Sequence, residues 1–186
     1  MEILAVGVLL WSLVHFVPSI AQPVKKLCIK LLGENGYKLV FSVFVIISLG
    51  LMVYGWRHIT PIVVYNLPLW VKPISLILMV VAFVLFGAAN YQTRIKSFIR
   101  HPQLIGVISW STAHLLVNGD NRSIVLFGGM GIWAMLEIFV INRRDGAWIK
   151  QTAPGWPQEF KGLAISLIVF IIAVLVHPYI AGVSLR

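Results

Sequence analysis

Long apolar segments alternate with short polar ones along the chain, and six of the apolar segments are candidate membrane-spanning helices. They cover residues 3–20, 39–56, 67–89, 103–117, 123–141 and 163–180. About 20 residues cross a hydrocarbon core about 30 Å thick, and only the fourth segment is clearly short. The pattern predicts an all-α fold, an integral membrane bundle of six transmembrane helices, in one domain over residues 1–186.

Composition agrees with this class of protein. Of the 186 residues, 59% are hydrophobic and 11% are charged, whereas about a quarter of a soluble domain is charged. This balance excludes disordered chains and ordinary cytosolic enzymes. The chain has one cysteine, Cys28, which excludes an internal disulfide and the CxxCH motif that attaches haem covalently.

The net charge of +9 comes from cations in the gaps between the apolar segments, where they set topology rather than bind nucleic acid. If the six segments cross the membrane, one side carries Lys25, Lys26, Lys30, Lys38, Arg94, Lys96, Arg100, Arg143, Arg144, Lys150 and Lys161. The other side carries only Arg57, Lys72, Arg122 and Arg186. The positive-inside rule therefore predicts an inner-membrane protein with both termini on the periplasmic side.

A nine-residue motif, G-V-x-x-W-S-x-x-H, occurs in the first and the fourth segments, at residues 7–15 and 106–114. The two copies begin three spans apart, so they run in opposite directions across the bilayer, as in a 3+3 inverted repeat. Within each copy Trp and Ser precede His by four and three residues, which places the three side chains on one helix face. The histidines are His15 and His114.

Both histidines are predicted near the middle of the membrane. His15 lies ~18 Å from the outer start of its span and His114 ~16 Å from the inner start of its own. Opposed helices could bring the imidazoles face to face as axial ligands of one haem b, with Trp11 and Trp110 as flat walls. A hydrogen bond from each His to a neighbouring helix is an equal alternative from the pattern alone. Zinc is disfavoured because no third or fourth ligand is found at that depth.

Other polar residues are candidates for supporting roles. His101, Arg100, Lys96 and Arg94 form a basic patch that could pair with haem propionates, lipid phosphates or simply the membrane interface. His177, before Pro178 near the outer surface, is the best substitute iron ligand if His15 or His114 is not used. Glu137 is expected to reach Arg143 or Arg144 at the inner edge.

The stretch from Arg100-His101-Pro102-Gln103 through Trp110 and His114 to Asn118-Gly119-Asp120 and Gly128-Gly129 resembles the signature of NnrU-domain membrane proteins. These are related to plant and cyanobacterial 15-cis-zeta-carotene isomerase. His15 with Pro18-Ser19, Asn142-Arg143-Arg144 and His177-Pro178 extend the resemblance over nearly the whole chain. It implies a haem b membrane protein whose axial ligands match His15 and His114.

The resemblance leaves several functions open. The bacterial branch is linked to nitrite and nitric oxide reduction in denitrification, and the isomerase branch to redox-gated cis-trans isomerisation of a lipophilic polyene. Whether this chain is an enzyme stays open, and its catalytic residues are unknown. A non-enzymatic accessory module for reductase maturation is an alternative. Arg100-His101-Pro102-x-x-x-Gly106 is also similar to isoprenylcysteine-type methyltransferases that bind S-adenosylmethionine, although the expected Tyr is Leu104 and paired acidic residues are absent.

Overall fold

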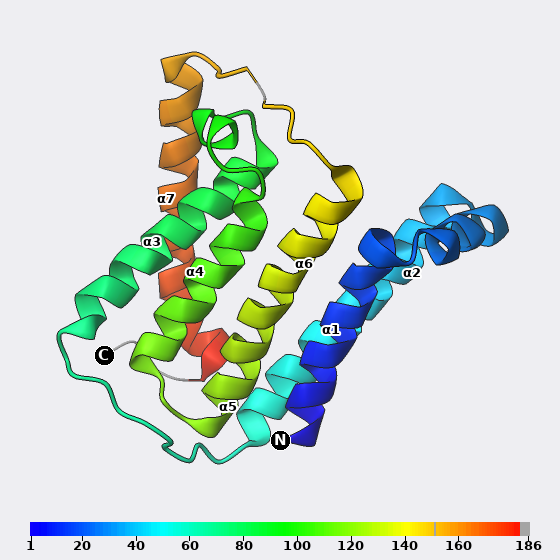
Figure 1. The fold of residues 1–186 in the computed structure, drawn as a ribbon. Coiled ribbons are helices and arrows are strands. Elements are labelled where there is room, and N and C mark those ends of the chain that lie inside the picture. Colours follow the sequence, from blue (N-terminus) through cyan, green and yellow to red (C-terminus); the bar gives the residue numbers. More distant parts are fainter. Residues whose placement is uncertain (151, 183–186) are drawn as a thin grey trace.

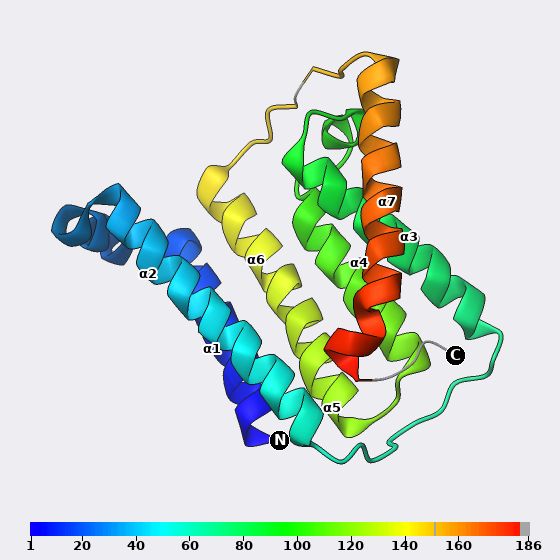
Figure 2. The same ribbon diagram turned by 180° about the vertical axis from the view of Figure 1, so that it is seen from behind.

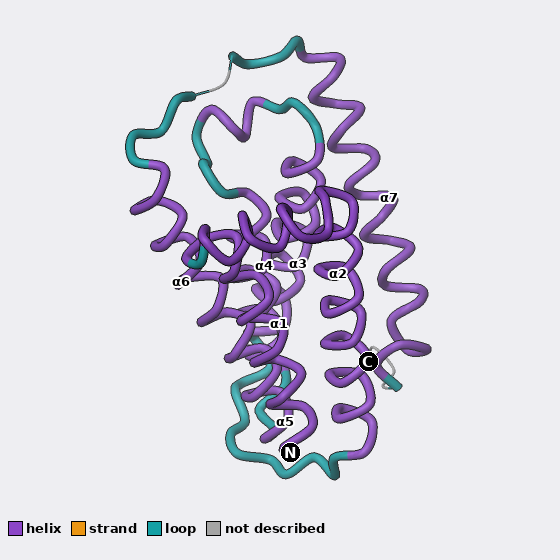
Figure 3. The backbone as a smooth tube through the Cα atoms, turned by 90° about the vertical axis from the view of Figure 1, so that its right-hand side faces the viewer, coloured by secondary structure: helices purple, strands orange, loops and turns teal. Residues whose placement is uncertain are grey.

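The computed structural model describes residues 1–150 and 152–182, and every named element in them is a helix (Figure 1). Six long helices run up and down the molecule, joined by loops and short helical turns (Figure 3). Their bounds are α1 Glu2–Ile20, α2 Gln22–His58, α3 Val71–Asn90, α4 Pro102–Val117, α6 Gly129–Asp145 and α7 Trp156–Ala181. The short turns are η1 Arg94–Ser97, α5 Asn121–Ser123 and η2 Ile124–Gly128.

The helices confirm the predicted class, an all-helical membrane bundle. In the described residues five helical runs are long and apolar enough to cross a membrane: α1, α2, α3, the continuous run Asn121–Asp145 and α7. The fourth predicted span, α4, has 16 residues and lies against α3 and α6. Large apolar side chains on the outside of α2 and α7, such as Leu39 and Leu175, are exposed, as lipid-facing residues would be.

Successive long helices point in opposite directions, so α1 and α4 run antiparallel, as the repeated motif predicted (Figure 1). They do not face each other. Helix α6 lies between them in both views and packs against each (Figures 1 and 2). On the far side, α7 covers α3 (Figure 2). The motif therefore predicted the direction of the two helices, and the packing order decides which side chains meet.

Glycines allow α1 and α2 to approach closely. A Cβ atom on Gly55 would lie 2.6 Å from the backbone nitrogen of Leu4, and one on Gly7 would lie 2.9 Å from the backbone nitrogen of Met52. Glycine has no side chain, so the two backbones can pack at a distance that excludes any other residue. This crossing fixes α1, and with it the first copy of the repeated motif.

Local signals explain the helix ends. Pro102 occupies the first turn of α4, where its missing N–H costs nothing. The Asp120 carboxylate accepts a hydrogen bond from the backbone N–H of Ser123 at 2.9 Å and caps the next helix. The sequence did not predict that residues 22–32 are helical and break at Gly33, where φ is +73°.

Candidate functional site

A pair of histidines lies between α4 and α7, near the end of the bundle where α7 finishes. The rings of His114 and His177 have centroids 6.3 Å apart and planes inclined by 27°. The Nδ1 of His114 donates a hydrogen bond to the backbone oxygen of Trp110 at 3.0 Å, which leaves its Nε2 free for a ligand. The Nδ1 of His177 is buried without a hydrogen-bond partner among the described residues.

Aromatic rings from three helices surround this pair. Phe127 stacks on His114 at 4.2 Å, Trp110 lies 5.1 Å from the same imidazole, and Trp56 packs edge-on against Phe127. Phe127 belongs to η2, a π-helical turn, and such turns occur often at functional sites. The extra residue in that turn changes which side chains the rest of the helix presents to α4.

The spacing of the pair suits one metal ion between two imidazoles. A metal ion lies about 2.0–2.1 Å from an imidazole nitrogen, so two rings on opposite sides have centroids roughly 6 Å apart. His114 and His177 have this separation. In the described residues no group of three or more His, Cys, Asp or Glu side chains could hold a metal. Two imidazoles would therefore need a cofactor that supplies the remaining ligands itself.

His15 belongs to a different cluster. It stacks on Trp11 at 4.2 Å and packs edge-on against Trp133 at 5.1 Å and Phe41 at 5.3 Å. Its Nδ1 donates to the backbone oxygen of Trp11 at 2.8 Å, the same local arrangement that His114 has. The repeated motif therefore fixes both imidazoles in the same way but in separate surroundings.

The offset between the two clusters can be estimated along one helix. His15 contacts Trp133 and His114 contacts Phe127, and these two aromatic residues are six positions apart on the continuous run from α5 to α6. Six residues of helix rise about 9 Å. In this structure His15 and His114 therefore lie in separate clusters rather than face to face. The reason is that α6 separates their helices. That they share one haem stays a prediction.

A cavity of about 430 Å³ opens beside His15, between α1, α4 and α6 and the segment before α4. Its walls include Trp11, His15, Trp133 and Glu137, and Lys96, Arg100 and His101 lie at the same end. Of the six cofactor-binding residues predicted from the sequence, His15, Trp11, Arg100 and His101 line this cavity, whereas His114 and Trp110 do not. The structure thus divides the predicted site in two.

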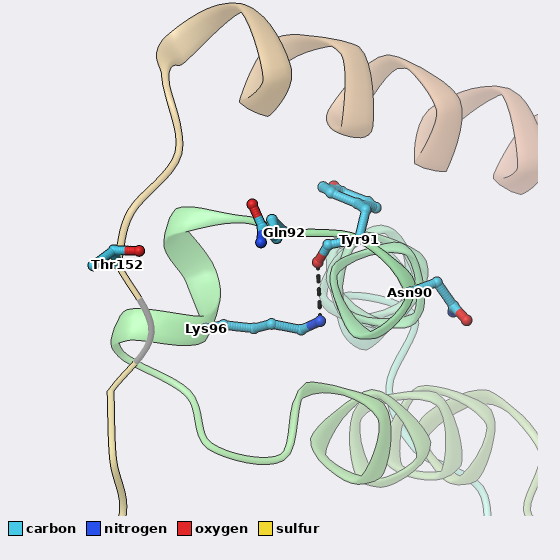
Figure 4. Close-up of a pocket in the computed structure, with 5 residues that line it drawn as sticks. All are labelled: Asn90, Tyr91, Gln92, Lys96 and Thr152. Carbon is cyan, nitrogen blue, oxygen red and sulfur yellow. Dashed lines mark hydrogen bonds between the residues drawn. The ribbon is translucent and has the colours of Figure 1, made fainter.

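The cations beside the cavity already have hydrogen-bond acceptors. Lys96 donates its Nζ hydrogens to the backbone oxygens of Ala89 and Tyr91, the second of which is drawn in Figure 4. Arg100 donates to the oxygen of Gly146 at 2.7 Å, and His101 pairs with Asn142 at 2.8 Å. These residues tie the α3–α4 segment to the end of α6.

Arg94 is held separately from this patch. Its guanidinium lies 4.1 Å from the Trp156 ring, and its backbone N–H donates to Glu159 at 2.8 Å. The predicted basic patch is therefore divided between α6 and α7. Arg94 serves to join η1 to the start of α7.

Glu137 does not reach the arginines that the sequence suggested. It is 5% exposed, and one carboxylate oxygen accepts a hydrogen bond from the Ser19 hydroxyl on α1. Arg144 instead pairs with Asp145 at 2.6 Å and donates to the oxygen of Pro18. The packing of α1 against α6 brings Ser19 to Glu137, and no spacing within the sequence could have indicated that contact.

The repeated motif and the helical bundle that carries it belong to a known family of membrane proteins. A family model described as NnrU protein matches residues 3–185. The chain belongs to the NnrU family. No curated protein and no solved structure matches it significantly. The NnrU domain covers the whole bundle, so both histidine clusters lie within it.

Sequence reasoning missed Phe127 and Trp133 as parts of the two clusters. Both are on the predicted fifth span, six residues apart, and aromatic residues in a membrane span are too common to single out. The π-helical turn that contains Phe127 carries no sequence signal beyond the glycines at and after its end, Gly128, Gly129 and Gly131. Their role follows only from the position of α6 between α1 and α4.

Proposed function

We propose that this NnrU protein binds haem b between α4 and α7, where His114 and His177 would hold the iron. The 6.3 Å separation of the two rings carries the proposal. The unpartnered Nδ1 of His177 supports it, because a buried imidazole nitrogen without a hydrogen bond is costly unless a ligand uses it. His177 was the substitute ligand in the sequence prediction, and His114 is common to both pairings.

Haem fits these residues better than a bare metal ion. The porphyrin supplies four nitrogen ligands, so the protein has to provide only the two axial ones. Phe127 and Trp110 give flat apolar surfaces beside the imidazoles. Arg57 lies at the same end, donates to the backbone oxygen of Tyr179 and has no carboxylate partner among the described residues, so it could pair with a propionate, whereas Arg122 is already paired with Asp120 at 3.5 Å.

Haem would give the protein an iron that exchanges one electron and, when an imidazole leaves, offers a coordination position. A neutral diatomic gas or a lipophilic polyene could reach such a site through the lipid. Nitric oxide chemistry in denitrification and polyene isomerisation are therefore both compatible proposals. His177 is the ligand better placed to leave, because its helix packs mainly against α3 and its last turns are half-exposed.

Absorption spectra of histidine variants test the proposal. The protein is purified in detergent with and without added haem, in both redox states and with nitric oxide. We expect a bis-histidine spectrum that is lost in His114→Ala and in His177→Ala. His58→Ala is the matched control, because His58 has the same Nδ1 hydrogen bond, to Tyr54 at 2.8 Å, but is exposed outside both clusters.

The outcomes separate the two pairings. Loss in His15→Ala and His114→Ala, with His177→Ala unchanged, would overturn the α4–α7 site and support the pair predicted from sequence. A protein that stays colourless with added haem would overturn haem binding altogether. A module without a cofactor that assists reductase maturation would then be the better interpretation.

A further inference from the structure

Residues 22–32 form a helical segment that takes no part in either histidine cluster. Only Ala21 separates the segment from α1, and the rest of α2 follows it, so it connects two membrane-spanning helices. It projects from the bundle at the end where α1 finishes (Figures 1 and 2). Most of its side chains are exposed, so the surroundings of the protein, rather than the bundle, are in contact with it.

Gly33 ends the segment with a sharp turn. Its backbone has φ +73° and ψ 170°, a combination that is essentially restricted to glycine. A Cβ atom there would meet no neighbour within 4 Å, so the backbone conformation, and not lack of space, requires the glycine. The segment is therefore free of the direction of the span that follows it. A helix that turns away at the end of two spans can lie in the plane of the lipid headgroups.

One face of the segment is apolar. It has the i, i+3, i+4, i+7 spacing of an amphipathic helix, with Val24, Leu27, Cys28 and Leu31. The large residues of this face are exposed, and Leu31 is 71% exposed. Contact with water is unfavourable for such a face, whereas the boundary between headgroups and acyl chains accommodates it.

Lysines border this apolar face. Lys26 and Lys30 are one helical turn apart on one side of it, and Lys25 lies on the other side. Among the described residues none of the three has a carboxylate within ion-pair distance. The only acidic residue in positions 21–40 is Glu34, and its carboxylate pairs with Lys38 at 2.9 Å. Three ammonium groups are therefore available to an external anion.

We infer that residues 22–32 are a binding surface for anionic phospholipid headgroups. The apolar face enters the boundary of the acyl chains, and Lys25, Lys26 and Lys30 bind the phosphates at its borders. A bilayer is the occupant that the position favours, because the ends of two spans hold the segment at headgroup level. Anionic lipid thereby fixes the connection between α1 and α2 on the membrane surface. The inference is independent of the proposed haem site.

The single cysteine of the chain allows a test in the full-length protein. Cys28 is half-buried within the segment, so a bimane fluorophore attached to it reports the lipids nearby. The labelled protein is placed in nanodiscs of brominated phosphatidylglycerol in phosphatidylcholine, or of the brominated neutral lipid in the anionic one. Bromine quenches a fluorophore at short range, so the ratio measures lipid preference beside Cys28. We expect a preference of about threefold or more for phosphatidylglycerol, reduced in high salt.

Two matched pairs of lysine substitutions locate the preference. Lys26→Gln combined with Lys30→Gln removes two charges from the segment and should abolish most of it. Lys150→Gln combined with Lys161→Gln removes the same charge from exposed lysines in and before α7 and should leave it unchanged. Equal quenching by both lipids in the wild type would overturn the inference. The same result in the two lysine pairs would also overturn it, because the lysines of the segment would then have no special role.

The apolar face is tested separately. Leu27→Gln combined with Leu31→Gln should lower quenching by both brominated lipids, because the segment no longer enters the acyl boundary. If neither lipid quenched the wild-type label, a second copy of the chain or another protein would cover the segment, and lipid binding would be refuted. Unchanged quenching in the leucine variant would refute insertion of this face.

Discussion

The two copies of the G-V-x-x-W-S-x-x-H motif have the same local geometry and different neighbours. In each, the histidine Nδ1 donates to the backbone oxygen of the tryptophan one turn earlier. His114 then meets an imidazole from α7, whereas His15 meets indoles and a cavity that contains a buried carboxyl. The same motif therefore orients two imidazoles in the same way, and the surrounding helices decide whether each faces a second imidazole or an open cavity.

This difference shows that a repeat in sequence need not build one symmetric site. Helix α6 packs against both α1 and α4 and contributes Trp133 to one cluster, and the π-helical turn η2 just before it contributes Phe127 to the other. The two regions also depend on different helix ends. The His15 cavity is lined by the end of α3 and the start of α4, whereas the His114–His177 pair lies at the end of α7, to which Trp56 and Arg57 of α2 donate hydrogen bonds. Variants can therefore disturb one region and spare the other.

The largest difference in stability between the two regions is expected from two matched glycine substitutions. Gly55→Leu places a side chain against the backbone of Leu4, which cannot move aside, and should destabilise the α1–α2 contact by about 3 kcal/mol. In Gly87→Leu the new side chain meets the Ser166 hydroxyl on α7, which can rotate, so we expect a cost of about 1 kcal/mol. Thermal unfolding in detergent measures both.

The two glycine variants should also differ in the site that they damage. Gly55 precedes Trp56, which packs against Phe127 beside His114, so Gly55→Leu should alter the haem spectrum. Gly87 lies twelve residues after Ser75, whose hydroxyl donates to the Ala113 oxygen beside His114, and this is about 18 Å along α3, so Gly87→Leu should leave the spectrum unchanged. If both variants changed the spectrum equally, the two clusters would form one cooperative unit and the comparison would fail.

The sequence predicted most of the fold for physical reasons that are local. Apolar length set the spans, and Pro102 and Asp120 set helix ends. The third span begins at Val71 rather than at residue 67 because the chain turns through Pro68 and Leu69 first. The helix at 22–32 was missed because its lysines were interpreted as a loop between spans.

The candidate site was predictable only in part. Trp11 with His15, and Trp110 with His114, are contacts one helical turn apart, so spacing alone indicates them. His177 beside His114, and Ser19 beside Glu137, join positions 63 and 118 residues apart and depend on the packing order of the helices. A single sequence contains no signal for that order.

A smaller effect is expected from changing the ring that supports each histidine. Phe127 is 4% exposed and stacks on His114, and Phe41 is half-buried and packs edge-on against His15. Phe127→Leu should cost about 1–2 kcal/mol and shift the haem spectrum, because the imidazole loses its stacked neighbour. Phe41→Leu should cost less than 1 kcal/mol and leave the spectrum unchanged. A spectral shift in Phe41→Leu instead would place the haem at His15.

The smallest effect concerns the loop that holds the end of α4. The Tyr65 hydroxyl donates to the backbone oxygen of Leu115, next to His114, and Tyr65→Phe should cost about 1 kcal/mol. Removal from water, and secondarily the charge of Asp120, raises the pKa of Tyr65 above 10.0. Because the folded state holds the phenol proton more tightly, this stability is present at neutral pH and is lost as pH rises through the folded-state pKa.

Unfolding of wild type and Tyr65→Phe from pH 8 upward measures this contribution. The wild type should lose stability in strong alkali, and the difference between the two proteins should shrink there. Tyr37→Phe is the matched control on the His15 side, because Tyr37 packs near Phe41 and its hydroxyl has no hydrogen bond among the described residues. Equal alkaline loss in Tyr65→Phe and wild type would show that the loop does not anchor α4, and that the position of His114 depends on α3, α6 and α7 alone.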